Sequence, residues 1–325
     1  MKVNLVGKTG HSGVGIYTQE LREALSKKDI EIDFQKTYSV LNPDFLNQVL
    51  LSRFLLDKRS DINHITTQDL MSAYYLSTNQ KIVVTVHDIF PYLDYSGKVY
   101  SWMAKRYVRN IEKKADRVIA ISEFTKEQLI ENTSLDSSDI DVVYQGVDLE
   151  TFRPQKEKES KDYFLHVGSE IDRKNIEGLI EIFEEIKKRE QDTKLIRVGN
   201  ISEKTKKIIK NSDLVLGKDI VYKTDITEEK LVELYSGARK LLFPSHAEGF
   251  GRPIIESLAC GTPVVAYNKK PMSEILPEEM MVEYRDQTKF VEKALSTEDN
   301  NPRDYAEDFT WDRTAEEVIK TYERA

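Results

Sequence analysis

Short apolar runs alternate along the chain with longer segments whose apolar positions recur at helical spacing. The short runs predict buried strands, because β-branched and other apolar residues are nearly continuous in them. They lie at 2–6, 30–34, 61–65, 81–86, 118–121 and 141–144 in the first half of the chain, and at 163–168, 195–199, 220–222, 240–243 and 264–267 in the second. Strands that alternate with helices predict the α/β class, with a parallel sheet in each half.

A polar stretch separates the two halves. Residues 151–161 include Pro154 and the alternating charges of 156–159, which is typical of a linker. A chain of 325 residues has room for two domains of ordinary size. We therefore predict two Rossmann-like, doubly wound domains, at 1–153 and 160–301.

Composition and charge exclude several classes of protein. Hydrophobic residues make up 39% of the chain, charged residues make up 32%, and no apolar run is long enough to span a bilayer. The net charge of −8 argues against general binding to nucleic acid. The N-terminus lacks the apolar core of a signal peptide, and the lone Cys260 cannot form an internal disulfide. These features predict a cytoplasmic protein.

Two carboxylates, Glu248 and Glu256, flank a glycine loop in the second half. A buried strand at 240–243 precedes the loop, and Pro253 suits the first position of the helix that follows. This order directs backbone N–H groups and a helix N-terminus at one point, which favours an anion. The two acids then fit the hydroxyls of a ligand attached to a phosphate. The alternative is a plain strand–turn–helix connection with two surface acids.

A second glycine loop, at 7–15, follows the first strand and precedes a helix. It matches neither the dinucleotide-binding fingerprint nor the P-loop, so a plain tight turn is an equal alternative. His87 and Asp88 follow the strand at 81–86, where ligands of α/β sheets bind. The alternative for His87 is a histidine whose hydrogen bonds are satisfied within the fold. Ser122 is predicted to cap the helix that follows it.

A basic helix is predicted at 98–117, with seven lysines and arginines against two acids. Its apolar positions include Tyr107, Val108 and Ile111. Such a helix could contact anionic lipid or an acceptor phosphate. The alternative is a solvated surface helix.

Several segments, taken in order, resemble the retaining GT-B glycosyltransferases of family 4, the group 1 glycosyl transferases. They are 12–21, His87-Asp88, 115–125, 143–154 and the two glutamates of the Glu-x7-Glu motif, Glu248 and Glu256. The resemblance covers nearly the whole chain. It implies two domains facing across a cleft, and a C-terminal helix at about 302–325 that packs back on the N-terminal domain.

The resemblance also implies roles for individual residues. Glu248 would bind hydroxyls of the donor sugar, Glu256 the ribose, and Lys174 the diphosphate. Where many relatives carry an arginine this chain has Ser169, and Arg173 is the expected substitute. The implied catalytic residues are His87, Glu248, Lys174 and Arg173. The implied donor-binding residues are Gly13, Gly15, Gly168, Ser169, Arg173, Lys174, His246, Glu248, Gly249, Phe250, Gly251 and Glu256. The implied acceptor-side residues are His11, His87, Asp88 and Ser122.

The implied function is metal-independent transfer of a sugar, with retained configuration, from a GDP- or UDP-linked donor. Neither a cofactor nor a metal is expected. Arg173-Lys174-Asn175 favours mannose by resemblance. The expected acceptor is a glycan or a lipid-linked saccharide, and an anionic membrane surface is a candidate partner that would make the protein peripheral. A non-catalytic nucleotide-sugar-binding or scaffold protein is the main alternative. A nucleotide-dependent oxidoreductase is suggested only by the first glycine loop.

Overall fold

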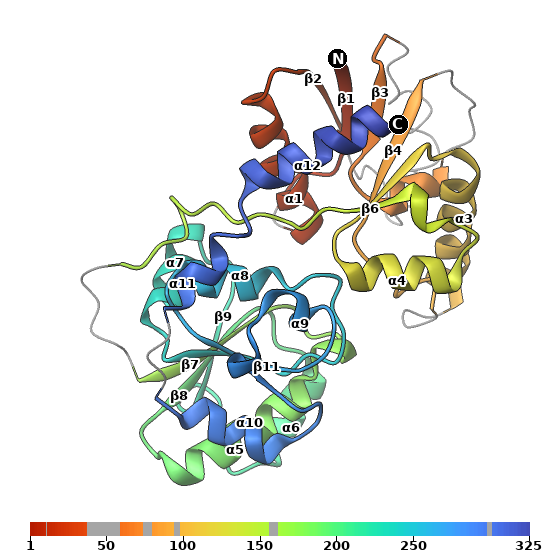
Figure 1. Ribbon diagram of the computed structural model, residues 1–325. Helices are drawn as coiled ribbons and strands as arrows, with labels where there is room; N and C mark the ends of the chain where they lie inside the picture. Colours follow the sequence, from red (N-terminus) through yellow and green to blue (C-terminus); the bar gives the residue numbers. More distant parts are fainter. Residues whose placement is uncertain (11, 38–58, 74–79, 94–97, 156–161, 298–300) are drawn as a thin grey trace. The chain divides into compact units, whose positions relative to one another are not determined.

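The computed structural model describes residues 1–10, 12–37, 59–73, 80–93, 98–155, 162–297 and 301–325 (Figure 1). The chain forms two compact units. The first unit comprises Met1–Gly146 and Trp311–Ala325, and the second unit comprises Val147–Thr310. Each unit contains one six-stranded sheet whose strand pairs are all parallel, so the predicted α/β class is confirmed.

The sheet of the first unit has the strand order β2-β1-β3-β4-β5-β6. Its strands are β1 (Lys2–Gly7), β2 (Glu31–Lys36), β3 (Ile62–Ile65), β4 (Lys81–Val86), β5 (Arg117–Ala120) and β6 (Ile140–Val142). Its helices are α1 (Gly13–Ser26), α3 (Lys98–Lys114), α4 (Glu123–Asn132) and α12 (Trp311–Arg324), with short 3₁₀ turns at Gln68–Ala73 and Ser137–Asp139. The strands β1, β3, β4 and β5 contribute side chains to two cores, one on each face of the sheet. One core lies against α1 and α12, and the other lies against α3 (Figure 1).

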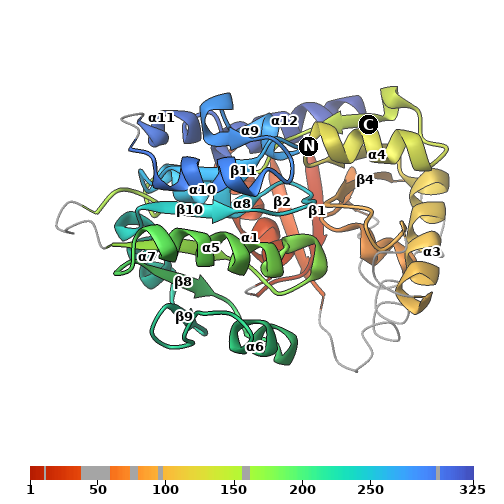
Figure 2. The same cartoon turned by 90° about the horizontal axis from the view of Figure 1, so that it is seen from below.

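The sheet of the second unit has the strand order β12-β11-β10-β7-β8-β9. Its strands are β7 (Tyr163–Val167), β8 (Lys194–Val198), β9 (Ile220–Lys223), β10 (Lys240–Phe243), β11 (Val264–Tyr267) and β12 (Met281–Val282). Its helices are α5 (Ile176–Arg189), α6 (Glu203–Lys210), α7 (Glu228–Gly237), α8 (Arg252–Ala259), α9 (Met272–Ile275), α10 (Gln287–Leu295) and α11 (Pro302–Ala306), with 3₁₀ turns at Asp172–Lys174 and Glu278–Met280. Figure 2 shows α5 and α10 side by side. The strand order reverses between β7 and β10, and ligands of such sheets bind beyond the carboxyl ends at this point.

The chain passes from the first unit to the second after Gly146 and returns after Thr310, and both boundaries differ from the predicted ranges. The segment from Val147 and the short helix α11 belong to the second unit. Arg303 of α11 accounts for this, because its guanidinium donates to the carbonyls of Leu149 and Phe152 at 3.0 Å and of Ala259 at 2.5 Å. The expected linker lies partly at 156–161, outside the described residues.

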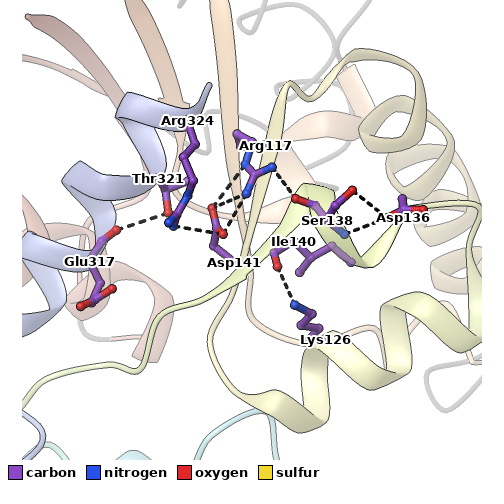
Figure 3. A network of polar contacts seen from close by, with 9 residues as sticks. All are labelled: Arg117, Lys126, Asp136, Ser138, Ile140, Asp141, Glu317, Thr321 and Arg324. Carbon is purple, nitrogen blue, oxygen red and sulfur yellow. Dashed lines mark hydrogen bonds and ion pairs between the residues drawn. The ribbon is translucent and has the colours of Figure 1, made fainter.

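Helix α12 packs into the first unit through a buried polar chain. The Tyr322 hydroxyl lies 2.7 Å from Nδ1 of His64, and Nε2 of His64 lies 2.8 Å from the Thr85 hydroxyl. The Thr85 hydroxyl in turn lies 3.2 Å from that of Tyr17. At the surface, Arg324 of α12 joins the ion pair between Arg117 and Asp141, at 3.1 Å from Asp141 (Figure 3).

We expect Tyr322→Phe to destabilise the first unit. The substitution leaves a buried imidazole nitrogen of His64 without its partner, which costs about 1–3 kcal/mol. Both tryptophans of the chain, Trp102 and Trp311, belong to the first unit, so urea unfolding followed by tryptophan fluorescence measures this change. Glu323→Gln, on an exposed position of the same helix, is the matched control and should change stability by less than about 0.5 kcal/mol. Equal stability of Tyr322→Phe and wild type would contradict the account.

Candidate active site

A buried carboxylate lies between two cations at the carboxyl end of the second sheet. The Glu248 side chain is only 5% exposed. Its Oε2 lies 2.7 Å from Nη1 of Arg173, and its Oε1 lies 2.6 Å from Nζ of Lys174. The structure thus brings together three of the four residues expected to be catalytic. We call this group the carboxylate clasp.

Backbone contacts fix the two loops that form the carboxylate clasp. The His246 N–H donates to the Arg173 carbonyl at 2.7 Å, and Arg173 also donates to the Ala247 carbonyl at 3.0 Å. Asn175 adopts a left-handed conformation (φ 54°) that ends the Asp172–Lys174 turn and begins α5. Its side chain caps Gly178 N and donates to the Pro244 carbonyl at 3.0 Å. These contacts therefore hold together two loops that lie about 70 residues apart in the chain.

Burial and the attraction between Lys174 and Glu248 shift the pKa of each of these two residues in opposite directions. Burial lowers the pKa of Lys174, and the positive charges of Arg173 and Arg197 lower it further, against the opposing effect of Glu248. Burial alone would raise the pKa of Glu248, but Lys174 and Arg173 outweigh it and the pKa falls below its usual value. Glu248 is therefore ionised at neutral pH, as a partner of both cations.

The second glutamate, Glu256, lies in the short helix α8 and is held by its own neighbours. Tyr235 donates to its Oε2 at 2.9 Å, and Arg252 Nε donates to its Oε1 at 2.6 Å. Gly251 precedes α8 with φ 119°, a conformation that favours glycine. The Phe250 ring packs edge-on against Phe309 at 6.0 Å. Each carboxylate oxygen retains a second lone pair, so Glu256 can still accept from hydroxyls.

Gly168, Ser169 and His246 lie around the same edge of the sheet. Gly168 has φ 149°, and a Cβ at this position would be 3.7 Å from Nζ of Lys174. Ser169 is exposed. His246 Nδ1 lies 3.2 Å from the Tyr284 hydroxyl, and the residue helps to line a cavity of about 260 Å³ beside α5 and α6. A larger cavity of about 380 Å³ lies away from these residues, around Tyr163 and Lys194.

In the first unit, His87 is buried at the end of β4. Its Nε2 donates to the Thr66 carbonyl at 2.9 Å, and its backbone N–H donates to Gln68 Oε1 at 3.0 Å. The Tyr17 ring packs edge-on against it at 4.7 Å. Burial lowers its pKa to about 4, against the opposing effects of the Thr66 carbonyl and Asp69. The imidazole is therefore neutral at pH 7, and its Nδ1 carries the lone pair that can accept a hydrogen bond.

The other acceptor-side residues are placed as follows. Asp88 accepts from the Phe90 N–H at 3.3 Å. Ser122 is fully buried and caps α4 as predicted, accepting from the Thr125 N–H at 3.0 Å. His11 lies outside the described residues.

The two glycines of the first loop have different surroundings. Gly15 needs its missing side chain, because a Cβ would lie 2.6 Å from the Gly10 carbonyl oxygen. Gly13 is exposed, and a Cβ there would meet no described atom within 4 Å. The packing of this unit therefore explains Gly15, while the predicted approach of a donor at Gly13 stays a prediction.

Sequence reasoning missed four side chains that organise the site, namely Glu170, Arg197, Tyr235 and Arg252. Arg197 had the clearest signal, since it is a charged residue inside the apolar run at 195–199. The described residues contain no cluster of three or more histidine, cysteine or acidic side chains that could hold a metal ion. Metal independence stays a prediction. Among the described residues, no helix is long and apolar enough to cross a membrane.

The fold and the site define the class of protein, an α/β protein of two Rossmann-like units with the GT-B architecture. Residues 148–310 match the family model of the group 1 glycosyl transferases, and residues 34–151 match that of glycosyltransferase family 4. The first match covers half of the chain, so the chain belongs to the group 1 glycosyl transferase family.

Individual relatives are more distant. The chain is 31% identical over 195 residues to the O-antigen chain mannosyltransferase RfbU of Salmonella typhimurium, covering 59% of this chain and 54% of that protein. It is 27% identical over 247 residues to a D-inositol 3-phosphate glycosyltransferase of Gordonia bronchialis, covering 67% of this chain and 54% of the relative. The chain thus spans about half the length of these relatives. The Anabaena protein HepE, solved with UDP-glucose, has the same fold, with a TM-score of 0.76, 16% identity and 100% coverage of both chains.

We expect His87→Asn to weaken the pH dependence of stability of the first unit. The folded state keeps His87 neutral down to about pH 4, whereas the unfolded chain protonates it below about 6.5. The contribution of neutral His87 to the free energy of unfolding is therefore fully present above pH 6.5 and is lost as the pH falls toward 4. One proton corresponds to about 1.4 kcal/mol per pH unit, and the variant should lose up to that much of the slope. Urea unfolding by tryptophan fluorescence at pH 7, 6 and 5 measures it, and an unchanged slope would contradict it.

Proposed function

We propose that the protein is a glycosyltransferase that moves a hexose from a nucleotide-diphosphate sugar to a glycan or lipid-linked saccharide. The observation that carries the proposal is the carboxylate clasp, which lies at the carboxyl end of a parallel sheet. The chain that contains it belongs to a family of glycosyl transferases. Ligands of such sheets bind at this end. The same residues would serve a non-catalytic nucleotide-sugar-binding protein, so turnover is the decisive measurement.

The chemistry requires that the leaving diphosphate be stabilised as negative charge grows on it. Lys174 and Arg173 are fixed cations at the proposed donor site, and fixed charges need no reorganisation when the reaction occurs. In this proposal Glu248 plays two parts. It aligns both cations through its ion pairs, and its remaining lone pairs accept from hydroxyls of the donor sugar. Glu256 holds the ribose of the nucleotide.

We infer retention of the anomeric configuration from the family resemblance alone. In that mechanism the acceptor hydroxyl attacks from the face that the diphosphate leaves, and a phosphate oxygen takes its proton. Glu248 is then a binding residue, in agreement with its two short ion pairs. His87 assists on the acceptor side by accepting a hydrogen bond at Nδ1, because its Nε2–H is already donated to Thr66. Metal independence is part of the proposal, with the cations in the place of a metal.

Mannose is the favoured sugar in this proposal. Arg173-Lys174-Asn175 supports it, and so does the similarity to a protein named as a mannosyltransferase. The nucleotide stays open between GDP and UDP, because the neighbour HepE was solved with UDP-glucose. A thermal-shift screen of nucleotide sugars tests both points, since one stabilising compound identifies the donor.

An anionic membrane surface is a further part of the proposal. The apolar side of α3, with Tyr107, Val108 and Ile111, is buried in the core of the first unit. It therefore does not leave an apolar face for insertion over the described part of the helix. Lys105, Arg109 and Lys113 recur every four residues on the exposed side, and none has an ion pair with a described residue. Contact with lipid would thus be electrostatic.

We expect Glu248→Gln and Lys174→Met each to reduce transfer by at least about 100-fold, as removal of one charge-stabilising group commonly does. Release of nucleotide from the identified donor in the presence of acceptor measures the rate. Full activity in both variants would contradict the assignment of these residues to the active site.

The matched control for these variants is Lys187→Met. Lys187 forms an ion pair with Asp219 at 2.9 Å in the same unit, away from the carboxylate clasp. Its loss should lower stability but leave transfer within about twofold, because it touches none of the proposed donor residues. Donor binding by the wild type without turnover, over a panel of acceptors, would favour the non-catalytic alternative.

We expect reversal of Lys105, Arg109 and Lys113 to glutamate to weaken binding to vesicles that contain anionic lipid. Each basic residue near such a surface contributes about 1 kcal/mol, so affinity should fall by about 100-fold or more. Sedimentation with vesicles at low and high salt measures it. The control reverses three exposed lysines of α6, namely Lys206, Lys207 and Lys210, and should have little effect. Wild-type binding that is absent or insensitive to salt would contradict the membrane proposal.

A further inference from the structure

A buried arginine lies beneath the loop that carries the carboxylate clasp. Arg197 belongs to β8 and is 1% exposed, although charged side chains are almost never fully buried unless they are paired. Its Nη1 donates to Nδ1 of His166 at 2.9 Å and to the Gly168 carbonyl at 2.7 Å. Its Nη2 lies 3.5 Å from Oε1 of Glu170. These contacts connect β8 to the end of β7 and to the first residues of the loop.

Glu170 is itself rigidly held, so the network around Arg197 has a fixed frame. Its carboxylate accepts three hydrogen bonds of 2.7 Å, from the Ser202 N–H, the Thr205 hydroxyl and the Tyr222 hydroxyl. These partners lie at the start of α6 and on β9. Arg197 is therefore placed by β8, β9 and α6, and the Gly168 carbonyl is the backbone group of the loop that it holds.

The contact with Gly168 sets the orientation of one peptide. Gly199 leaves room for it, because a Cβ on Gly199 would lie 2.4 Å from the Gly168 oxygen. In a trans peptide the carbonyl and the following N–H point in opposite directions. With the Gly168 carbonyl turned toward Arg197, the Ser169 N–H must point away from the buried network. Ser169 is exposed, and its N–H donates to no described residue.

We propose that Arg197 is a positioning residue for the donor diphosphate, which turns the Gly168–Ser169 peptide so that the Ser169 N–H meets a phosphate oxygen beside Lys174. The inference rests on the proposed function. The opposite orientation of this peptide would direct a carbonyl oxygen at the phosphate, which is repulsive. Many relatives carry an arginine at this position, where this chain has Ser169. The backbone N–H of Ser169 then supplies a donor in place of the arginine side chain.

The experiment compares Arg197→Met with wild type for binding of GDP and UDP by calorimetry. Affinity for the nucleoside diphosphate that wild type prefers should fall by about tenfold, the effect of one hydrogen bond to a charged group. Affinity for the nucleoside without phosphates should not change, because the Ser169 N–H serves only the phosphates. An equal loss for nucleoside and diphosphate, or no loss, would overturn the proposal.

Two controls separate positioning from stability. Arg239→Met removes another arginine of the second unit, which pairs with Glu190 and the Leu295 carbonyl. It should lower the melting temperature without loss of diphosphate affinity, and a loss as large as that of Arg197→Met would overturn the proposal. Ser169→Ala keeps the N–H and removes the hydroxyl, so a tenfold loss of diphosphate affinity in this variant would assign the contact to the hydroxyl and also overturn the proposal.

The remaining outcomes are distinguishable from one another. If Arg197→Met does not fold, Arg197→Lys replaces it under the same criteria, because an ammonium keeps the charge but cannot reach all three partners in the guanidinium geometry. If wild type itself binds no nucleotide or nucleotide sugar, the proposed function is wrong, and the inference about Arg197 fails with it. If wild type binds and the variants bind equally well, only the inference about Arg197 fails.

Discussion

Glu248 is a buried carboxylate that contacts two cations from another loop, and the arrangement of the candidate donor site depends on those contacts. Removing one partner of a buried ion pair typically costs about 3–5 kcal/mol, because the other charge is left without compensation. The loop after β7 and the loop after β10 are therefore coupled through side chains as well as backbone. A site held in this way meets its ligand with the charges already in place.

The same region has an excess of positive charge. Arg173, Lys174 and Arg197 contribute three cations, whereas Glu170 and Glu248 contribute two carboxylates. Burial is the main cause of the lowered pKa of Lys174, and the charges of the two arginines lower it further, so the surroundings disfavour its charged form. An anion at the carboxyl end of the sheet would relieve it. The positive charge of this region therefore matches the negative charge of the proposed diphosphate ligand.

Much of this arrangement could be predicted from local sequence, and the rest depended on distant contacts. The strands and the pair Lys174 and Glu248 follow from apolar runs and from a family motif. Arg197 could not be placed, because its partners His166 and Glu170 are about 30 residues away and the strand pattern does not say which face it takes. The unit boundaries differ from the predicted ones for a similar reason, since Arg303 contacts Phe152 and Ala259, which are distant from it in the sequence. The amphipathic pattern of α3 fits a core or a membrane equally well, and only packing distinguishes them.

The two units treat charge differently at the carboxyl ends of their sheets. In the first unit, Lys8 of the glycine loop is paired with Asp69, and His87 is kept neutral by burial. In the second unit, Lys174 and Arg173 share one carboxylate. This difference agrees with the proposed function, in which the second unit binds the diphosphate and the first unit offers neutral hydrogen-bonding groups, such as Nδ1 of His87, to sugar hydroxyls. The glycine loop of the first unit matches no phosphate-binding motif, and its cation is already paired with Asp69. Close backbone packing explains Gly15, whereas a Cβ on Gly13 would meet no described atom within 4 Å.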